Sequence, residues 1–312
     1  MEGSPYPFYR YSTYLEKRYG RPAYRIGIDG GFSCPNRGKT RYEGGCTYCD
    51  AEGSRATYTR RSDTRTIEEQ IRRGREFLSA RYKAETFLLY FQAFSSTYAP
   101  VQQLREIYDF GLSCGRFEEL IVSTRPDCID REKASLLGSY RERGLDVWVE
   151  LGLQSVHERT LKRINRGHSV EEFFDAYRML KEAGVKVGVH VIFGLPGEDR
   201  DDCMETIQEL SRYRPDGIKI HNLHIQAGTS LASEYLGGEI SVLSAARHLD
   251  YVIGALELLP PQTVILRLTC DTPEKRLLAP RNFPNKDVFY AQVAERMRER
   301  QTYQGRLFLR NV

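Results

Sequence analysis

From residue 23 onward, short runs rich in apolar and β-branched residues alternate with longer stretches in which apolar residues recur every three to four positions. The short runs are typical of buried strands, and the longer stretches are typical of amphipathic helices. Because strands that alternate with helices pair in parallel, we expect a parallel sheet covered by helices, either doubly wound or closed into a barrel. The predicted strands span residues 23–29, 86–92, 119–123, 146–151, 185–192, 216–220 and 263–268, and the predicted helices span 67–82, 100–113, 130–143, 169–183, 199–213 and 241–258. Thr66, Ser169 and Ser241 are the expected helix caps, and Pro100 suits a first helical turn.

The length of 312 residues allows two domains or one large domain with flanking segments. No low-complexity linker or internal repeat divides the chain, and 40% hydrophobic with 28% charged residues excludes disordered and collagen-like classes. No apolar run reaches the roughly 18 residues that a membrane span needs, and the first residues lack an apolar signal core. We therefore expect a cytoplasmic protein that does not enter a membrane.

Seven cysteines without a secretory signal indicate metal binding, catalysis or burial rather than a disulfide framework. Three of them, Cys34, Cys46 and Cys49, follow the first predicted strand with the spacing Cys-x11-Cys-x2-Cys. Three thiolates can hold three corners of a [4Fe–4S] cluster and leave the fourth iron open to an external ligand. A zinc site normally needs a fourth protein ligand, and no second CxxC or HxxxH is near. The spacing alone leaves cluster and zinc both open.

The long cysteine motif resembles that of the YhcC/YtqA group of the radical S-adenosylmethionine (SAM) superfamily, a relative of the elongator catalytic subunit. The resemblance spans about residues 25–225 and rests on GGFSCPNR, GGCTYC, YFQAFSSTYAP, ELGLQS, INRGHS, HVIFGLPGE and KIHNLHI. It implies an α/β fold in which residues 25–260 form a partial (β/α)6 TIM-like barrel. Residues 1–24, rich in Tyr and Arg, and residues 261–312, packed on the barrel, would be extensions. One departure is Gly38, where the family has an Asp after CPNR.

Strand alternation places Glu150 and Gln154 on one face near the carboxyl end of their strand, as expected of an active site. A solvated edge or a satisfied core pair would place them the same way. The resemblance implies that Cys34, Cys46 and Cys49 hold a [4Fe–4S] cluster, that Gln154 reaches the SAM ribose, and that Arg166 pairs with the methionine carboxylate.

Other SAM contacts follow from the family pattern and from strand alternation. The chain lacks the superfamily's usual Gly-Gly-Glu stretch, so Gln92 or the backbone of Ser95 and Ser96 would bind the SAM amino group. Gly194 opens a turn that resembles the adenine-side turn, and His190 points inward on its strand. The expected cofactor-binding residues are Tyr48, Gln92, Ser95, Glu150, Gln154, Arg166, His190 and Gly194.

Candidate catalytic residues are His221 and Lys219, which point inward on the sixth strand, and Cys270, which follows the last strand. His224 is a further possible substrate contact. An inward histidine is also common as a hydrogen-bonded core residue. Cys114, Cys128 and Cys203 are expected to be small buried or partly buried side chains.

The resemblance implies one-electron reduction of SAM to a 5′-deoxyadenosyl radical that removes a hydrogen atom from the substrate, with an external electron donor such as flavodoxin or ferredoxin. The expected substrate is tRNA, modified on the side chain of the wobble uridine. A radical enzyme acting on a small molecule or a protein and a non-catalytic, zinc-stabilised RNA-binding module are the alternatives. A net charge of +4 does not discriminate between them.

Six tyrosines lie among basic residues in the N-terminal segment. Such rings can stack on unpaired bases while Arg and Lys contact phosphates. The same rings could instead pack this segment across the barrel. The tyrosines are Tyr6, Tyr9, Tyr11, Tyr14, Tyr19 and Tyr24.

Overall fold

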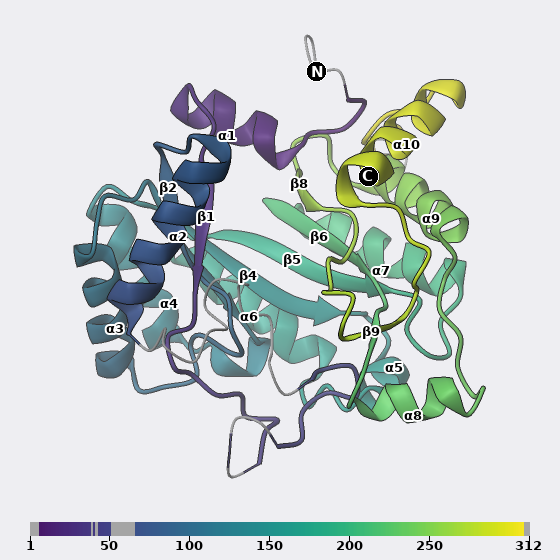
Figure 1. Cartoon of the computed structure of the whole chain (residues 1–312), viewed down its shortest axis with the longest axis horizontal. Helices are drawn as coiled ribbons and strands as arrows, with labels where there is room; N and C mark the ends of the chain where they lie inside the picture. Colours follow the sequence, from purple (N-terminus) through teal and green to yellow (C-terminus); the bar gives the residue numbers. More distant parts are fainter. Residues whose placement is uncertain (1–5, 39, 41–42, 51–65, 309–312) are drawn as a thin grey trace.

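The structure is a computed structural model that describes residues 6–38, 40, 43–50 and 66–308 (Figure 1). Its centre is one curled parallel sheet of seven strands, in the order β1-β2-β3-β4-β5-β6-β8. The alternation therefore yields a half-barrel with extensions, and the predicted fold class is confirmed. The strand expected at 263–268 forms the seventh strand of the sheet. The strands are β1 (Tyr24–Ile28), β2 (Phe87–Phe91), β3 (Glu119–Thr124), β4 (Asp146–Gln154), β5 (Lys186–Phe193), β6 (Gly217–Asn222) and β8 (Val264–Arg267).

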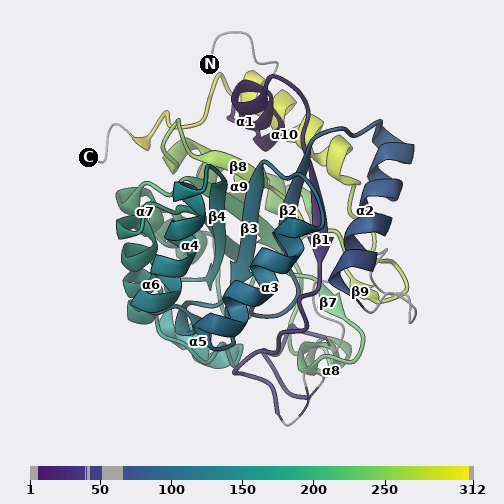
Figure 2. The same cartoon turned by 90° about the vertical axis from the view of Figure 1, so that its left-hand side faces the viewer.

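Helices cover the outer face of the sheet, as Figure 2 shows for α2, α3, α4 and α6. The outward side chains of the strands and the apolar stripes of the helices form one continuous core. The helices that alternate with the strands are α2 (Ile67–Tyr82), α3 (Val101–Ser113), α4 (Arg131–Glu142), α6 (Val170–Glu182), α7 (Arg200–Tyr213) and α9 (Ala245–Leu258).

Short polar side chains fix where these helices begin. The Thr66 hydroxyl accepts the backbone N–H of Glu69, and Ser169 forms a capping box with Glu172. Ser241 was the expected cap of the last predicted helix, but α9 is capped by Ser244, whose hydroxyl accepts the N–H of Arg247. Both serines precede the apolar stripe, and only Ser244 stands directly before it.

The N-terminal helix α1 (Tyr11–Tyr19) lies across the amino end of the barrel, next to β8 (Figure 1). Leu15 is buried there, Tyr14 packs edge-on against Trp148 with ring centroids 5.6 Å apart, and Tyr11 and Tyr19 donate hydrogen bonds to Glu119. The six N-terminal tyrosines all pack against the protein core, which is the second of the two alternatives for this segment.

Smaller elements gather at the carboxyl ends of the strands, and a last helix packs against α9. The small elements include a two-stranded antiparallel sheet of β7 (Ile225–Gln226) and β9 (Leu277–Ala279). No helix in the described part of the chain is long and apolar enough to cross a membrane. The remaining helices are α5 (Glu158–Arg163), α8 (Ser230–Leu236), α10 (Lys286–Glu299) and the 3-10 turn Pro126–Cys128.

Candidate functional site

The three grouped cysteines lie in the loop that leaves the carboxyl end of β1. Cys46 is buried, whereas Cys34 and Cys49 are partly exposed. The N–H of Cys49 donates to the Cys46 carbonyl at 2.9 Å, and the N–H of Thr47 donates to the Ile164 carbonyl at 3.0 Å. The turn that carries Cys46 and Cys49 is therefore fastened to the segment that follows β4 and α5.

Two asparagines and two glycines shape this loop. The Asn36 amide donates to the Asn165 carbonyl and, at 3.5 Å, to the Cys46 sulfur, while the Asn165 amide donates to the Gly45 carbonyl at 3.0 Å. Gly44 and Gly45 adopt φ values of 66° and 108°, in the region that favours glycine. At Gly38 an added Cβ would lie 2.8 Å from a Glu43 carboxylate oxygen, so the acid of the family pattern would crowd a like charge here.

Two buried guanidinium groups flank the Cys46 sulfur. Nη1 of Arg166 lies 3.6 Å from it and Nη1 of Arg125 lies 3.8 Å from it. A hydrogen bond with the Cys49 thiol holds the pKa of Cys46 well below its usual range, and both guanidinium groups act in the same direction, against the effect of burial. The surroundings of Cys46 thus favour a thiolate.

The two guanidinium groups differ in their other partners. Arg125 forms an ion pair with Asp127 at 2.9 Å, and its charge also acts on Cys34. Among the described residues no carboxylate pairs with Arg166, which is only 6% exposed. The side chains whose interactions favour the charged form of Arg166 are Tyr48, Cys46 and Cys49. A buried cation of this kind is costly unless a ligand or group brings a negative charge.

The carboxyl end of β4 carries Gln154 next to Arg166. Gln154 has a φ of 78°, and the register between β4 and β5 shifts between Gly152 and Gln154. Arg166 donates to the Gly152 carbonyl at 2.8 Å and to Nε2 of His168 at 2.9 Å. A Cβ at Gly152 would lie 2.6 Å from both the Gln154 amide and the Arg166 guanidinium, so a larger residue here would displace these two side chains. The structure brings the two predicted residues together.

Glu150 lies deeper in the barrel, and its carboxylate is already bonded within the chain. Arg25 pairs with it at 2.6 Å, His190 lies 3.1 Å from it, and Tyr90 and Lys219 also contact it. Although burial opposes it, Lys219 and Arg25 hold the pKa of Glu150 well below its usual range. Both carboxylate oxygens of Glu150 therefore have protein partners.

The same network contains Lys219 and His190, two of the predicted site residues. Burial lowers the pKa of Lys219 to about 7, with Glu150 opposing, and burial and Lys219 lower the pKa of His190 to about 4. The His190 ring lies 5.4 Å from the His221 ring, measured between centroids. The predicted inward histidines are thus neighbours.

Cys270 lies against His221, so these two predicted residues are neighbours. The Cys270 sulfur is 3.2 Å from Nδ1 of His221, and burial raises the pKa of this thiol to about 11. The Asn222 side chain accepts the N–H of Cys270 at 2.8 Å and the hydroxyl of Thr269 at 3.0 Å. Asn222 thereby fixes the segment that follows β8. His224 points elsewhere and contacts Thr272 at 2.9 Å.

The other predicted cofactor-binding residues lie at the ends of neighbouring strands. The Gln92 side chain covers Gly27, where a Cβ would be 2.8 Å from the amide, and Gly194 begins the turn after β5 with a φ of 83°. The N–H of Ser95 donates to the Ser33 carbonyl at 3.1 Å. The hydroxyls of Ser95 and Tyr48 are buried without a hydrogen-bond partner among the described residues.

Sequence reasoning missed several residues of this region. Arg25 alternates with Gly27 on the inner face of β1, so strand alternation could have found it. Asn36 lies in the quoted CPNR motif. Arg125 and Asn222 lie after β3 and at the end of β6, where side chains of parallel strands meet. No sequence signal distinguished these two from ordinary surface residues.

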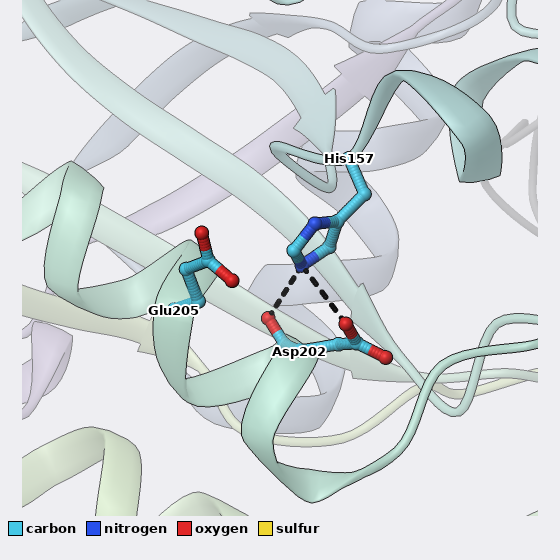
Figure 3. Close-up of side chains that lie close together, drawn as sticks. All are labelled: His157, Asp202 and Glu205. Atoms are coloured by element: carbon cyan, nitrogen blue, oxygen red, sulfur yellow. Dashed lines mark hydrogen bonds and ion pairs between the residues drawn. The ribbon is translucent and has the colours of Figure 1, made fainter.

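A different group of side chains is close enough to share one small ion. The ligand atoms of His157, Asp202 and Glu205 lie within 4.8 Å of one another (Figure 3). His157 Nε2 contacts the Asp202 backbone carbonyl at 3.0 Å and the Asp202 carboxylate at 3.5 Å, and this carboxylate also pairs with Arg159 and caps α7. These contacts join the start of α5 to α7, which explains why the three side chains lie close together.

The cysteine sulfurs do not form so tight a group among the described residues. One zinc ion, with bonds of about 2.3 Å, holds its sulfur ligands about 4 Å apart. Three thiols flanked by two guanidinium groups would suit an anionic iron–sulfur cluster.

Comparison with known proteins gives matches over most of the chain. The family model described as "Radical SAM superfamily" matches residues 34–210, and the "Radical_SAM C-terminal domain" model matches residues 215–299. The uncharacterized protein YtqA of Bacillus subtilis (strain 168) is 35% identical over 317 residues, which cover 99% of this chain and 98% of YtqA.

Two more distant likenesses concern proteins from Methanocaldococcus infernus. The tRNA uridine(34) acetyltransferase is 30% identical over 158 residues, which cover 49% of this chain and 29% of that protein. The solved structure of Elp3 with an N-terminal deletion shares the fold, with a TM-score of 0.64 at 20% identity over 78% of this chain and 63% of that chain. With the family models and a full-length relative in agreement, the chain belongs to the radical SAM superfamily.

Proposed function

We propose that Cys34, Cys46 and Cys49 hold a [4Fe–4S] cluster with which this enzyme cleaves SAM, and that its substrate is the wobble-uridine side chain of a tRNA. The observation that carries the proposal is the buried Arg166, which lies 3.6 Å from the Cys46 sulfur without a carboxylate partner in the described part of the chain. Such a cation suits both an anionic cluster and the methionine carboxylate of SAM.

The residues around Arg166 would orient SAM at the carboxyl end of the sheet. Gln154, which lies beside Arg166 at Gly152, would bind the ribose, and the turn at Gly194 would contact the adenine through its backbone. The chemistry that the bound cluster supplies is one-electron reduction of SAM, which gives the radical that removes a substrate hydrogen atom. We propose an external donor such as flavodoxin or ferredoxin for that electron.

The barrel would keep this chemistry away from water. Helix α1 covers the amino end, where Tyr14, Trp148 and Leu266 fill the interior. The carboxyl end, which carries the cysteines, Gln154 and His221, is therefore the side on which substrate and SAM would meet. His221 and Cys270 would contact the substrate there. Lys219 and Glu150, which are bonded to each other deeper in the barrel, would hold the neighbouring strands in position.

The tRNA substrate is supported by the relative named tRNA uridine(34) acetyltransferase, which matches about half of this chain. The match covers 29% of the acetyltransferase, and the rest of that protein has no counterpart in this alignment. The proposal therefore concerns the uridine and not acetyl transfer.

SAM cleavage tests the cofactor proposal. The chain is reconstituted anaerobically with iron and sulfide and then mixed with SAM and dithionite. We expect a cluster spectrum and 5′-deoxyadenosine from the wild type, none from Cys49→Ala, and wild-type amounts from the matched control Cys114→Ala, because Cys114 lies at the end of α3. Retained cleavage by Cys49→Ala would show that the ligand assignment is wrong.

Nucleoside mass spectrometry of tRNA tests the substrate proposal separately. A strain deleted for this gene should accumulate a precursor of one wobble-uridine modification, and the complemented strain should restore the modified form. An unchanged wobble-uridine profile would overturn the tRNA proposal and leave the cofactor proposal in place.

A further inference from the structure

Four cationic side chains meet along the seam where the barrel does not close. The two edge strands, β1 and β8, do not pair with each other, and the N-terminal segment lies along β8, with Arg10 bridged to Ile265. Arg25 lies on β1, Arg267 ends β8, and Lys286 begins α10. The charges of Arg10, Arg25 and Arg267 all act on Lys286. Four separate parts of the chain thus contribute to one cation cluster.

The cluster contains more positive charge than the protein neutralises. Arg25 has a carboxylate partner in Glu150, at 2.6 Å. Within the described ranges, Arg10, Arg267 and Lys286 form no ion pair. Asp287 is the acidic group whose charge acts on Lys286. In the described part of the chain, three cations without an ion pair therefore gather here, with Asp287 beside Lys286.

Aromatic rings hold two of these cations in place. The Arg10 guanidinium carbon lies 4.1 Å from the centre of the Tyr6 ring and 5.2 Å from that of Tyr290, and Lys286 Nζ lies 5.7 Å from the Tyr290 ring. Such contacts position a cation and leave its hydrogen-bond donors free for another partner. Burial and the neighbouring charge of Arg267 lower the pKa of Lys286, so the like charges act against one another. An anion at the seam would relieve that repulsion.

The charge of the cluster suits a phosphate group. Guanidinium groups donate pairs of hydrogen bonds that match phosphate oxygens. The positive charge of several cations is also more than one carboxylate neutralises, so a phosphate is the better match. Arg267 also acts on His190, Lys219 and His221, so the seam is next to the barrel interior. A phosphate held there would leave the adjoining nucleoside close to the inward histidines.

We propose that the cation cluster of Arg10, Arg25, Arg267 and Lys286 binds a backbone phosphate of the RNA strand whose nucleotide enters the barrel. The proposal rests on the tRNA substrate proposed above. It names a contact surface that the N-terminal tyrosines, which pack against the core, do not supply.

Binding of labelled RNA tests the cluster directly. The reconstituted full chain is titrated into end-labelled total tRNA from the deletion strain, and fluorescence anisotropy is recorded over a series of salt concentrations. We expect the double variant Arg267→Gln/Lys286→Gln to bind at least about 10-fold more weakly at low salt. The slope of log K against log salt should fall by about 1, because each lost phosphate contact releases about 0.7–0.9 fewer counterions.

The matched control removes two charges elsewhere. Arg131→Gln/Arg178→Gln changes two exposed side chains, 83% and 55% accessible, on α4 and α6, which cover the middle of the sheet. This variant should bind within about twofold of the wild type. Lys286→Gln alone, in the first turn of α10, should weaken binding by about threefold and serves if the double variant fails to fold.

Equal affinities of the cluster variants and the control would overturn the phosphate site, as would a wild-type chain that does not bind tRNA. The nucleoside profile separates this result from the substrate proposal. Weakened binding by the cluster variants together with an unchanged wobble-uridine profile would support the RNA site and overturn the wobble-uridine proposal. A changed wobble-uridine profile together with equal affinities of the cluster variants and the control would support the wobble-uridine proposal and overturn the phosphate site.

Discussion

Two groups of buried charge lie inside the same barrel and are balanced in different ways. At Glu150 a carboxylate is matched by Arg25 and Lys219, with hydrogen bonds from neighbouring strands. At Cys46 the excess charge is cationic, because Arg166 has no carboxylate partner among the described residues and Arg125 lies beside the same sulfur. The Glu150 carboxylate finds its partners within the chain, whereas the Cys46 group needs a negative charge from outside.

This difference separates a supporting network from a binding site. Buried charges are costly unless they are paired and hydrogen-bonded, so the Glu150 network is expected to stabilise the fold only while all its members are present. The Cys46 group would have its missing charge supplied by a cluster and by SAM. Loss of a side chain should therefore lower stability in the first group and ligand binding in the second.

The largest effect is expected from Glu150→Gln. The change leaves Arg25 and Lys219 buried without their carboxylate, which should lower the free energy of unfolding by about 3–5 kcal/mol. Urea denaturation at pH 7 measures it. Glu182→Gln, at an exposed surface pair, is the control and should change the free energy of unfolding by less than about 1 kcal/mol. An equal loss in the two variants would contradict the network.

Arg166→Gln should act on the ligand instead. Losing a charge-assisted pair with the methionine carboxylate should weaken SAM binding by about 100-fold. The variant should lower the free energy of unfolding less than Glu150→Gln does, because Arg166 has no carboxylate partner among the described residues. Equilibrium dialysis of labelled SAM with the reconstituted chain measures the affinity. Arg163→Gln, three residues earlier in an exposed pair with Glu234, should bind SAM normally. Unchanged affinity in Arg166→Gln would remove its proposed role.

Acid should destabilise the fold through its buried histidines. Burial lowers the pKa of His190 and of His248 to about 4, so between about pH 6.5 and pH 4 the unfolded chain takes up protons that the folded chain does not. The free energy of unfolding should therefore fall as the pH falls through this window. Urea denaturation at pH 7, 6 and 5 measures the trend, and His190→Gln should make it shallower. A flat or rising profile would contradict the burial of neutral histidines.

The alternating part of the fold could be predicted closely from the sequence because strong periodic patterns mark it. The helix expected at 67–82 is α2, Ile67–Tyr82. The strand expected at 146–151 is β4, which starts at Asp146 as expected and extends three residues further, to Gln154. Helix α1 was not predicted. Its tyrosines and charges carry no clear apolar stripe, since they bond to Glu119 and Asp146 on the barrel rather than to a uniform apolar surface.

The candidate site could be predicted less completely. Gln154 and Arg166 follow from the family pattern, and the structure brings them together at Gly152. Alternation correctly placed Glu150 on the inner face, but a strand pattern cannot say which partners a carboxylate finds there. Four other strands supply those partners and make Glu150 part of a network. Contacts between residues far apart in the sequence decide the role of such a residue.

The most direct test of cluster binding is the EPR spectrum of the reconstituted and reduced chain, recorded before and after SAM is added. Binding by Cys34, Cys46 and Cys49 predicts about four irons per chain and a signal whose shape changes with SAM in the wild type. The change should require much more SAM in Arg166→Gln. A chain that takes up one zinc and no iron, or a signal that SAM leaves unchanged, would contradict it.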